Sequence, residues 1–151
     1  ADEPTTALDV TIQAQVLDLM NDMRREFAGA IMFITHDLGV IAGMADDVIV
    51  MYRGKVVESA TVRDLFKTPR HPYTRGRLRS VPSLTGNTTR LETIEGTVPS
   101  PTEAIRGCAF ASRCPDVMAI CREAVPALAG PEGHRAACFL HHDRIEERPH
   151  A

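Results

Sequence analysis

Several features that define common protein classes are missing from this sequence of 151 residues. It has no tryptophan, and aromatic residues make up only 5% of it. No apolar run approaches the roughly 20 residues that a membrane-spanning helix needs, and there is no signal-peptide pattern. The formal net charge of −3 argues against general affinity for nucleic acid. The hydrophobic fraction of 44% is nevertheless sufficient for a buried core.

A phosphate-binding loop is also missing. Such a loop needs Gly, four residues, then Gly-Lys and Ser or Thr, so that backbone amides can surround the phosphates. The chain has one Gly-Lys pair, Gly54-Lys55, with Ile49 five positions before Gly54 and Val56 after Lys55. No two glycines are adjacent anywhere. The sequence therefore lacks the usual main contact for a nucleotide triphosphate.

The N-terminal segment does contain acids in a suggestive setting. Asp2-Glu3 is followed by Pro4, and Asp9 is a good N-cap for a helix. The residues after Asp9 are apolar at helical spacing, namely Ile12, Val16, Leu19, Met23 and Phe27. The pattern predicts that the two acids lie at a turn between a strand and a helix.

A second apolar run, Ala30–Ile34, is short and continuous, which is typical of a strand buried on both faces of a parallel sheet. His36 follows directly after it. The order of elements predicts a βαβ unit, in which Asp2, Glu3 and His36 lie outside the carboxyl ends of the strands. Ligands collect at that edge of open α/β sheets.

These motifs resemble the second half of the ATPase domain of ABC transporters. Asp2-Glu3 is similar to the end of the Walker B strand, Thr6-Ala7-Leu8-Asp9 to the D-loop, and His36 to the switch histidine. The resemblance implies that Asp2 holds Mg²⁺, that Glu3 orients or deprotonates the attacking water, and that His36 contacts the γ-phosphate of ATP. Asp9 either caps the helix or takes part in a dimer contact. Since the P-loop and the family's signature motif are missing, we interpret the chain as the C-terminal portion of a longer ATPase.

A hairpin and two short helices are predicted next. Asp47–Tyr52 and Lys55–Glu58 have the composition of strands, and Arg53-Gly54 suits a tight turn between them. Thr61 starts a short helix that Pro69 ends, and Asp64 completes a capping box with Thr61.

The segment His71-Pro72-Tyr73 makes the resemblance more specific. It is similar to the HPY signature in the C-terminal extension of oligopeptide and dipeptide importer ATPases. Pro72 suits the first turn of a helix, and we expect a capping or packing role for His71 rather than metal ligation.

The four cysteines are all in the last third of the chain, at Cys108, Cys114, Cys121 and Cys138. We expect Gly107 to give backbone freedom before the first thiol, and Cys114-Pro115 to begin a helix that carries Cys121 about two turns along. Disulfides are disfavoured in a reducing compartment. Four thiolates suit tetrahedral Zn²⁺, although the usual Cys-x₂-Cys pairs are missing, and they equally suit an iron–sulfur cluster. The spacing alone leaves both metals open, whereas the resemblance implies a [4Fe-4S] cluster.

The predicted fold class is α/β: the C-terminal part of a P-loop ABC ATPase domain, with parallel strands, a hairpin and helices, followed by a small irregular cysteine-rich metal-binding extension. We divide it into the ATPase part (1–58), an HPY helical segment (59–80), an extended linker (81–106) and the four-cysteine extension (107–151), whose tail from Asp143 is expected to fray. His134, His141 and His142 are predicted to be surface residues.

The resemblance also implies a function and partners. The complete subunit would pair with a second ABC ATPase subunit and drive transmembrane permease subunits that receive solute from a binding protein. It would lie at the cytoplasmic face of the inner membrane, and the fragment alone would be inactive. Two alternatives are a stand-alone metal-containing interaction module with vestigial ATPase motifs and a soluble ABC ATPase of DNA repair. The sequence does not indicate whether the solute is an oligopeptide, a dipeptide, nickel or another compound.

Overall fold

The computed structural model describes residues 1–27, 29–80, 93–100 and 102–144, with side chains up to His141. The chain divides into two compact units, Ala1–Asp46 and Asp47–Ala151. None of the helices in the described ranges is both long enough and apolar enough to span a membrane.

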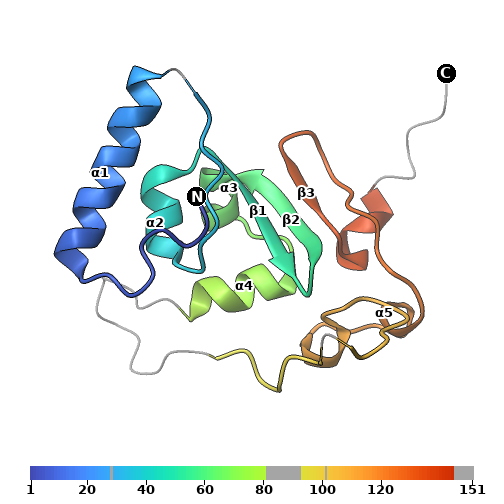
Figure 1. Cartoon of the computed structure of the whole chain (residues 1–151). Helices are drawn as coiled ribbons and strands as arrows, with labels where there is room; N and C mark the ends of the chain where they lie inside the picture. The colour runs from blue at the N-terminus through green and yellow to red at the C-terminus, as the bar shows by residue number, and fades with distance from the viewer. Residues whose placement is uncertain (28, 81–92, 101, 145–151) are drawn as a thin grey trace, which may run out of the picture. The chain divides into compact units, whose positions relative to one another are not determined.

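The first unit contains two helices (Figure 1), α1 from Val10 to Glu26 and α2 from Leu38 to Met44. Each begins at an aspartate whose carboxylate accepts hydrogen bonds from free backbone N–H groups of the first turn. Asp9 caps α1 by accepting from the N–H groups of Thr11 (3.0 Å) and Ile12 (2.9 Å). Asp37 caps α2 in the same way. The predicted N-cap of the long helix is therefore confirmed.

The prediction of a buried strand at Ala30–Ile34 was wrong. In this run only Ile34 makes a bridge, which is parallel and pairs it with Asp2. The side chains of Met32 and Ile34 are 77% and 49% exposed, and no residue of α1 is buried. A parallel strand is stabilised by neighbours on both sides and by helices on both faces. The described part of this unit supplies one short backbone partner, so the run stays an extended segment.

The second unit is built on a sheet of three strands in the order β1-β2-β3. The strands β1 (Asp47–Tyr52) and β2 (Lys55–Thr61) form the predicted hairpin. Arg53 and Gly54 have φ values of 47° and 73°, and positive φ at both central residues is typical of a type I′ turn. The strand β3 (His134–Ala136) was not predicted, and it pairs antiparallel with β2. The sheet of this unit is therefore antiparallel.

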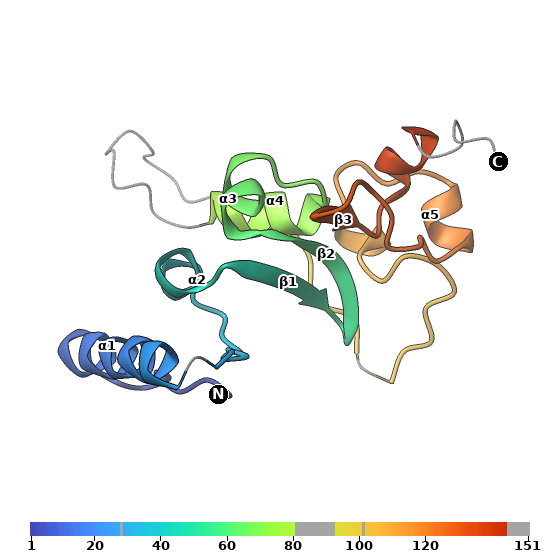
Figure 2. The ribbon, with the colours of Figure 1, turned by 90° about the horizontal axis from the view of Figure 1, so that it is seen from above.

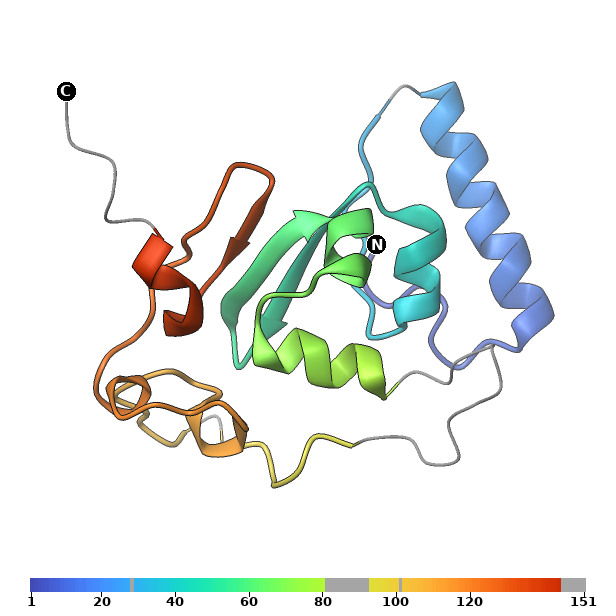
Figure 3. The same cartoon turned by 180° about the vertical axis from the view of Figure 1, so that it is seen from behind.

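Two helices follow the hairpin on one side of it (Figure 2), and Figure 3 shows the same arrangement from behind. The first, α3, runs from Val62 to Lys67 and has the predicted capping box, in which Thr61 Oγ1 accepts from the N–H of Asp64 at 3.2 Å. The second, α4, runs from Pro72 to Arg79. The predicted positions of both helix starts are confirmed.

The cysteine-rich extension contains only short elements, which are η1 (Ala111–Arg113), α5 (Ile120–Glu123) and η2 (Phe139–Arg144). The helix expected from Pro115 begins instead at Ile120, so Cys121 is its second residue. Part of the predicted linker (81–92 and 101) and of the predicted frayed tail (145–151) lies outside the described residues.

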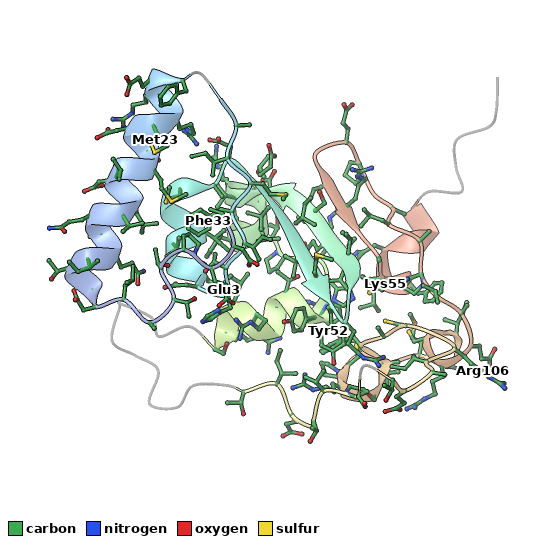
Figure 4. All side chains as sticks on the ribbon, viewed as in Figure 1. Glu3, Met23, Phe33, Tyr52, Lys55 and Arg106 are labelled. Atoms are coloured by element: carbon green, nitrogen blue, oxygen red, sulfur yellow. The ribbon has the colours of Figure 1, made fainter. Side chains whose placement is uncertain are left out.

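Aromatic side chains join the extension to the hairpin. Tyr52 lies at the end of β1 (Figure 4), and its ring centroid is 5.3 Å from that of Phe110 and 4.9 Å from that of Tyr73. Phe110 is 1% exposed and packs with Tyr52 and Val57 in one core cluster. Three rings from β1, α4 and the extension therefore meet at one place, although aromatic residues are scarce in the sequence.

A buried carboxylate provides a second connection. Glu58 on β2 is 0% exposed and accepts three hydrogen bonds. Two come from the backbone N–H groups of Arg70 (2.7 Å) and His71 (2.9 Å). The third partner is Nε2 of His134 on β3, at 2.8 Å. One side chain thus ties the hairpin, the segment before α4 and the third strand together.

Substitution Glu58→Gln is expected to lower the free energy of unfolding by about 1 to 3 kcal/mol, because the amide nitrogen cannot accept a hydrogen bond and leaves a buried donor unpaired. Urea unfolding of the 151-residue chain measures this difference. Glu132→Gln removes a carboxylate from an exposed position and serves as the matched control. Equal midpoints for the two variants would contradict the role given to Glu58.

Candidate nucleotide site and cysteine centre

The first candidate site is formed where the N-terminal segment lies beside the segment that ends in His36. The N–H of Glu3 donates to the carbonyl of Ile34 and the N–H of Ile34 donates to that of Ala1, both at 2.8 Å. This parallel pairing places Glu3 Oε1 3.1 Å from Nδ1 of His36. The structure therefore brings together two residues that are 33 positions apart and that the sequence singled out separately.

The carboxylate of Glu3 is further held by Thr6, whose hydroxyl donates to Oε2 at 2.9 Å. This hydrogen bond, followed by the one with His36, lowers the pKa of Glu3 below its usual value. Glu3 has a φ of 42°, in the left-handed region that few non-glycine residues adopt. Its labelled position in Figure 4 lies on the segment before α1. The arrangement fixes an ionised acceptor next to an imidazole, which is suited to binding a polarised water.

The other two predicted residues have different surroundings. Asp2 is exposed and belongs to the bridge with Ile34, so its carboxylate is accessible next to Glu3 in the chain. Asp9 is exposed too, and Oδ1 of its carboxylate is engaged in capping α1. The capping role predicted as one of two possibilities for Asp9 is present, and a dimer contact remains a prediction.

The second candidate site is a cavity lined by all four cysteines, Cys108, Cys114, Cys121 and Cys138, together with His71 and Asp116 among others. None of the four is in a disulfide. Among the residues with described side chains, no group of three or more His, Cys, Asp or Glu is arranged to hold one metal ion. The thiols therefore converge on a common space without the close tetrahedral spacing of a single-ion site.

Three thiols of this cavity resist ionisation. Burial raises the pKa of Cys108 and of Cys138, and it raises the pKa of Cys114 to about 11. Neighbouring cysteines contribute to each of these shifts, for example Cys121 to that of Cys108. Thiolates gathered in a buried space repel one another, so a positive group must offset their charge before several can ionise together.

Gly107 is required for a reason other than the predicted backbone freedom. A Cβ at this position would clash with the carbonyl oxygen of Cys121 and would lie 2.7 Å from the carbonyl carbon of Arg122. The next residue, Cys108, donates its N–H to the carbonyl of Cys121 at 2.8 Å. The absence of a side chain thus lets the segments of two cysteines approach each other closely.

Substitution Gly107→Ala is expected to lower the free energy of unfolding by about 1 to 3 kcal/mol, the usual cost of overpacking. The contact is with backbone, which cannot move aside as a side chain can. Gly43→Ala is the control, since a Cβ there meets nothing within 4 Å. Urea unfolding of both variants makes the comparison, and a Gly107→Ala protein as stable as the control would contradict the packing argument.

The prediction of surface positions for the histidines was wrong for His134, which is 8% exposed and pairs with Glu58. His141 is half-buried, with Nε2 3.0 Å from the carbonyl oxygen of Arg70, and the side chain of His142 lies outside the described part.

The sequence interpretation did not identify Glu58 or the ion pair between Arg75 and Asp116 at 3.1 Å. A glutamate directly after the apolar pair Val56-Val57 was the available signal for the first. No local pattern marks the second, which joins residues 41 positions apart.

His71 has the predicted capping role. Its Nδ1 accepts a hydrogen bond from the N–H of Tyr73 at 3.0 Å, and it is the N-cap of α4. Burial lowers the pKa of His71 to about 4. The imidazole is therefore neutral at physiological pH, as its acceptor role at the N-cap requires.

Comparison with known proteins agrees with the motifs. Residues 57–121 match the family described as "Oligopeptide/dipeptide transporter, C-terminal region". The chain is 55% identical, over 92% of its length, to a probable peptide ABC transporter ATP-binding protein of Sinorhizobium fredii, of which it covers 42%. It is 52% identical over 98% of its length to the oligopeptide transport ATP-binding protein AppD of Bacillus subtilis, covering 45% of that protein. Against the oligopeptide transport ATP-binding protein OppD of Salmonella typhimurium the identity is 50%, over 92% of this chain and 42% of the relative. The chain thus spans less than half the length of these relatives.

Proposed function

Because the chain belongs to the ATP-binding proteins of oligopeptide and dipeptide ABC transporters, we propose that it is part of the subunit that hydrolyses ATP to power solute import. The names of the relatives support peptides as the solute class. In this proposal the complete subunit pairs with a second ATPase subunit on the cytoplasmic side of the membrane. It drives permease subunits that receive solute from a solute-binding protein.

The pairing of Glu3 with His36 at 3.1 Å is the observation that carries the proposal. Hydrolysis of a phosphoanhydride needs an acceptor that orients the attacking water and a donor near the charge that develops on the phosphoryl oxygens. Glu3, with its lowered pKa, is the acceptor, and the imidazole of His36 is the donor. Both come from segments that the backbone holds side by side.

Asp2 completes the proposed set. Its accessible carboxylate is the hard oxygen ligand that Mg²⁺ prefers, and bound Mg²⁺ would neutralise negative charge on the phosphates. Asp9 starts α1 and fixes the direction of the chain after the acids. Most phosphate contacts in this class of ATPase come from a loop of the type that the sequence lacks.

The 151-residue chain alone is therefore expected to bind ATP weakly and to show no sustained turnover. The full-length subunit is expected to bind ATP tightly and to hydrolyse it with sustained turnover. Equilibrium binding of a fluorescent ATP analogue and release of inorganic phosphate, measured on both proteins in parallel, test this difference. Stoichiometric tight binding or steady turnover by the 151-residue chain would refute the idea that most phosphate contacts come from a loop that this sequence lacks.

For the cysteine cavity we propose a [4Fe-4S] cluster held by Cys108, Cys114, Cys121 and Cys138, with zinc as the alternative. Four thiolates are a usual ligand set for either group, and the four cysteines line one cavity. Among the described side chains no group of three or more is arranged to hold a metal ion, so the choice of the cluster over zinc rests on the family resemblance.

Anaerobic purification followed by metal analysis and a visible spectrum tests this part of the proposal. A brown protein that contains iron and sulfide and bleaches on reduction is expected. A colourless protein with one equivalent of zinc would replace the cluster by the alternative, and four free thiols without metal would refute both.

A further inference from the structure

We propose that Thr6 is a positioning residue for hydrolysis. Its hydroxyl holds one oxygen of the Glu3 carboxylate and thereby keeps the other oxygen directed at His36. In the proposed function, on which this inference rests, Glu3 and His36 act on the water that attacks ATP. Thr6 needs no contact with the nucleotide, because it acts through the orientation of Glu3.

The two oxygens of the Glu3 carboxylate have different partners. Oε2 accepts a hydrogen bond from Oγ1 of Thr6 at 2.9 Å, and Oε1 lies 3.1 Å from Nδ1 of His36. Because both oxygens belong to one planar group, the hydrogen bond to Oε2 restricts rotation of the whole carboxylate. Each oxygen of a carboxylate has a second lone pair, so Glu3 can still accept a proton from water.

The backbone fixes Thr6 relative to Glu3. The N–H of Thr6 donates to the carbonyl of Glu3 at 3.1 Å, and the N–H of Leu8 donates to that of Thr5 at 3.3 Å. Glu3 and Ala7 have φ values of 42° and 63°, which non-glycine residues adopt only where the surrounding structure requires it. Thr6 thus binds Glu3 through both its backbone and its side chain, from within a tight turn.

The carboxylate needs such a partner because packing restricts it little. The side chains of Glu3 and His36 are 45% and 69% exposed. A glutamate with this exposure has several side-chain rotamers open to it. The attacking water must be held in near-attack geometry, and a displacement of about 1 Å can cost a large part of the rate. Loss of the Thr6 hydroxyl is therefore expected to slow the chemical step and to leave ATP binding unchanged.

The experiment measures phosphate release by the full-length subunit over a range of ATP concentrations, which gives kcat and KM separately. Thr6→Val keeps the shape of the side chain and removes the donor, whereas Thr6→Ser keeps the donor and removes a methyl group. Thr97→Val makes the same change as Thr6→Val at an exposed position in the other compact unit and is the matched control.

We expect Thr6→Val to lower kcat about tenfold, with the KM for ATP within about twofold of the wild-type value. Thr6→Ser should retain kcat within about twofold, and Thr97→Val should equal the wild type. In the double variant with Glu3→Gln, Thr6→Val should cause no further loss, because residues that act through one another are not additive. If Thr6→Val does not fold, Thr6→Ala replaces it in each comparison.

A role of Thr6 in the turn alone would lower the yield of folded subunit and leave kcat per folded molecule unchanged. Such an unchanged kcat, a Thr6→Ser variant as slow as Thr6→Val, or a full tenfold loss added to that of Glu3→Gln would overturn this inference alone. A full-length wild-type subunit without turnover, or one whose turnover Glu3→Gln does not affect, would overturn it together with the proposed function.

Discussion

Substitution Glu3→Gln in the full-length subunit is expected to reduce ATP turnover by about 10² to 10⁴-fold, the usual contribution of a positioned base, while nucleotide affinity is kept. The amide has nearly the shape of the carboxylate but is a poor acceptor for the proton of an attacking water. It also lacks the charge that holds His36 at 3.1 Å. Phosphate release under saturating ATP and nucleotide binding at equilibrium measure the two quantities separately.

Glu26→Gln is the matched control, because Glu26 is an exposed glutamate at the C-terminal end of α1. This variant removes the same charge and should retain wild-type turnover. A parallel loss of binding and turnover in Glu3→Gln would show that the residue serves nucleotide binding rather than the chemical step. Unchanged turnover would remove Glu3 from the catalytic set.

If the four cysteines hold the proposed metal centre, substitution of one of them, for example Cys108→Ser, is expected to unfold most of the extension between Gly107 and Leu140. Ligation of a metal by thiolates contributes on the order of 10 kcal/mol in small sites, which exceeds the total stability of many domains. The large buried side chains of the extension are few, with Phe110 the main one, so packing cannot replace the lost ligation.

Hydrogen exchange read by mass spectrometry locates this effect. Amides of residues 107–140 should lose protection in Cys108→Ser, whereas those of α1 in the other compact unit should keep it. Ser112→Ala changes an exposed residue of the same segment and should leave protection unchanged. Full protection in Cys108→Ser would mean that the extension folds without its ligands.

The elements predicted well from the sequence are those specified by neighbouring residues. Asp9, Thr61 and His71 each cap a helix through an N–H two or three positions along the chain, and such contacts are encoded by local spacing. The turn at Arg53-Gly54 has the same local character. The hairpin and the starts of three helices could therefore be predicted without knowledge of the rest of the fold.

The elements predicted poorly depend on distant partners. The burial of Ala30–Ile34 requires strands and helices on both sides, and the described residues provide one bridge at Ile34. The strand β3 has three residues and exists because β2 offers it an edge. His134 is buried because it pairs with Glu58, and the sequence around residue 134 does not indicate that pairing.

The same distinction between local and distant contacts applies to the predictions made for the candidate sites. The proximity of Glu3 and His36 was expected from the ends of two adjacent segments, and the structure places them together even though one segment is not a strand. Their roles in hydrolysis come from the family resemblance and stay predictions. Convergence of the four thiols was expected from their crowding, while the contribution of α4 to their cavity needed the three-dimensional arrangement.

The pairing of β2 with β3 has a consequence for synthesis on the ribosome. Glu58 and His134 are 76 residues apart, and at roughly 5–20 residues per second the second appears roughly 4 to 15 s after the first. During this interval the N–H and C=O groups along one side of β2 have no partner strand. An open edge of this kind pairs readily with another chain. Nascent chains that stall before β3 are thus expected to expose a strand edge that can pair with a neighbouring chain.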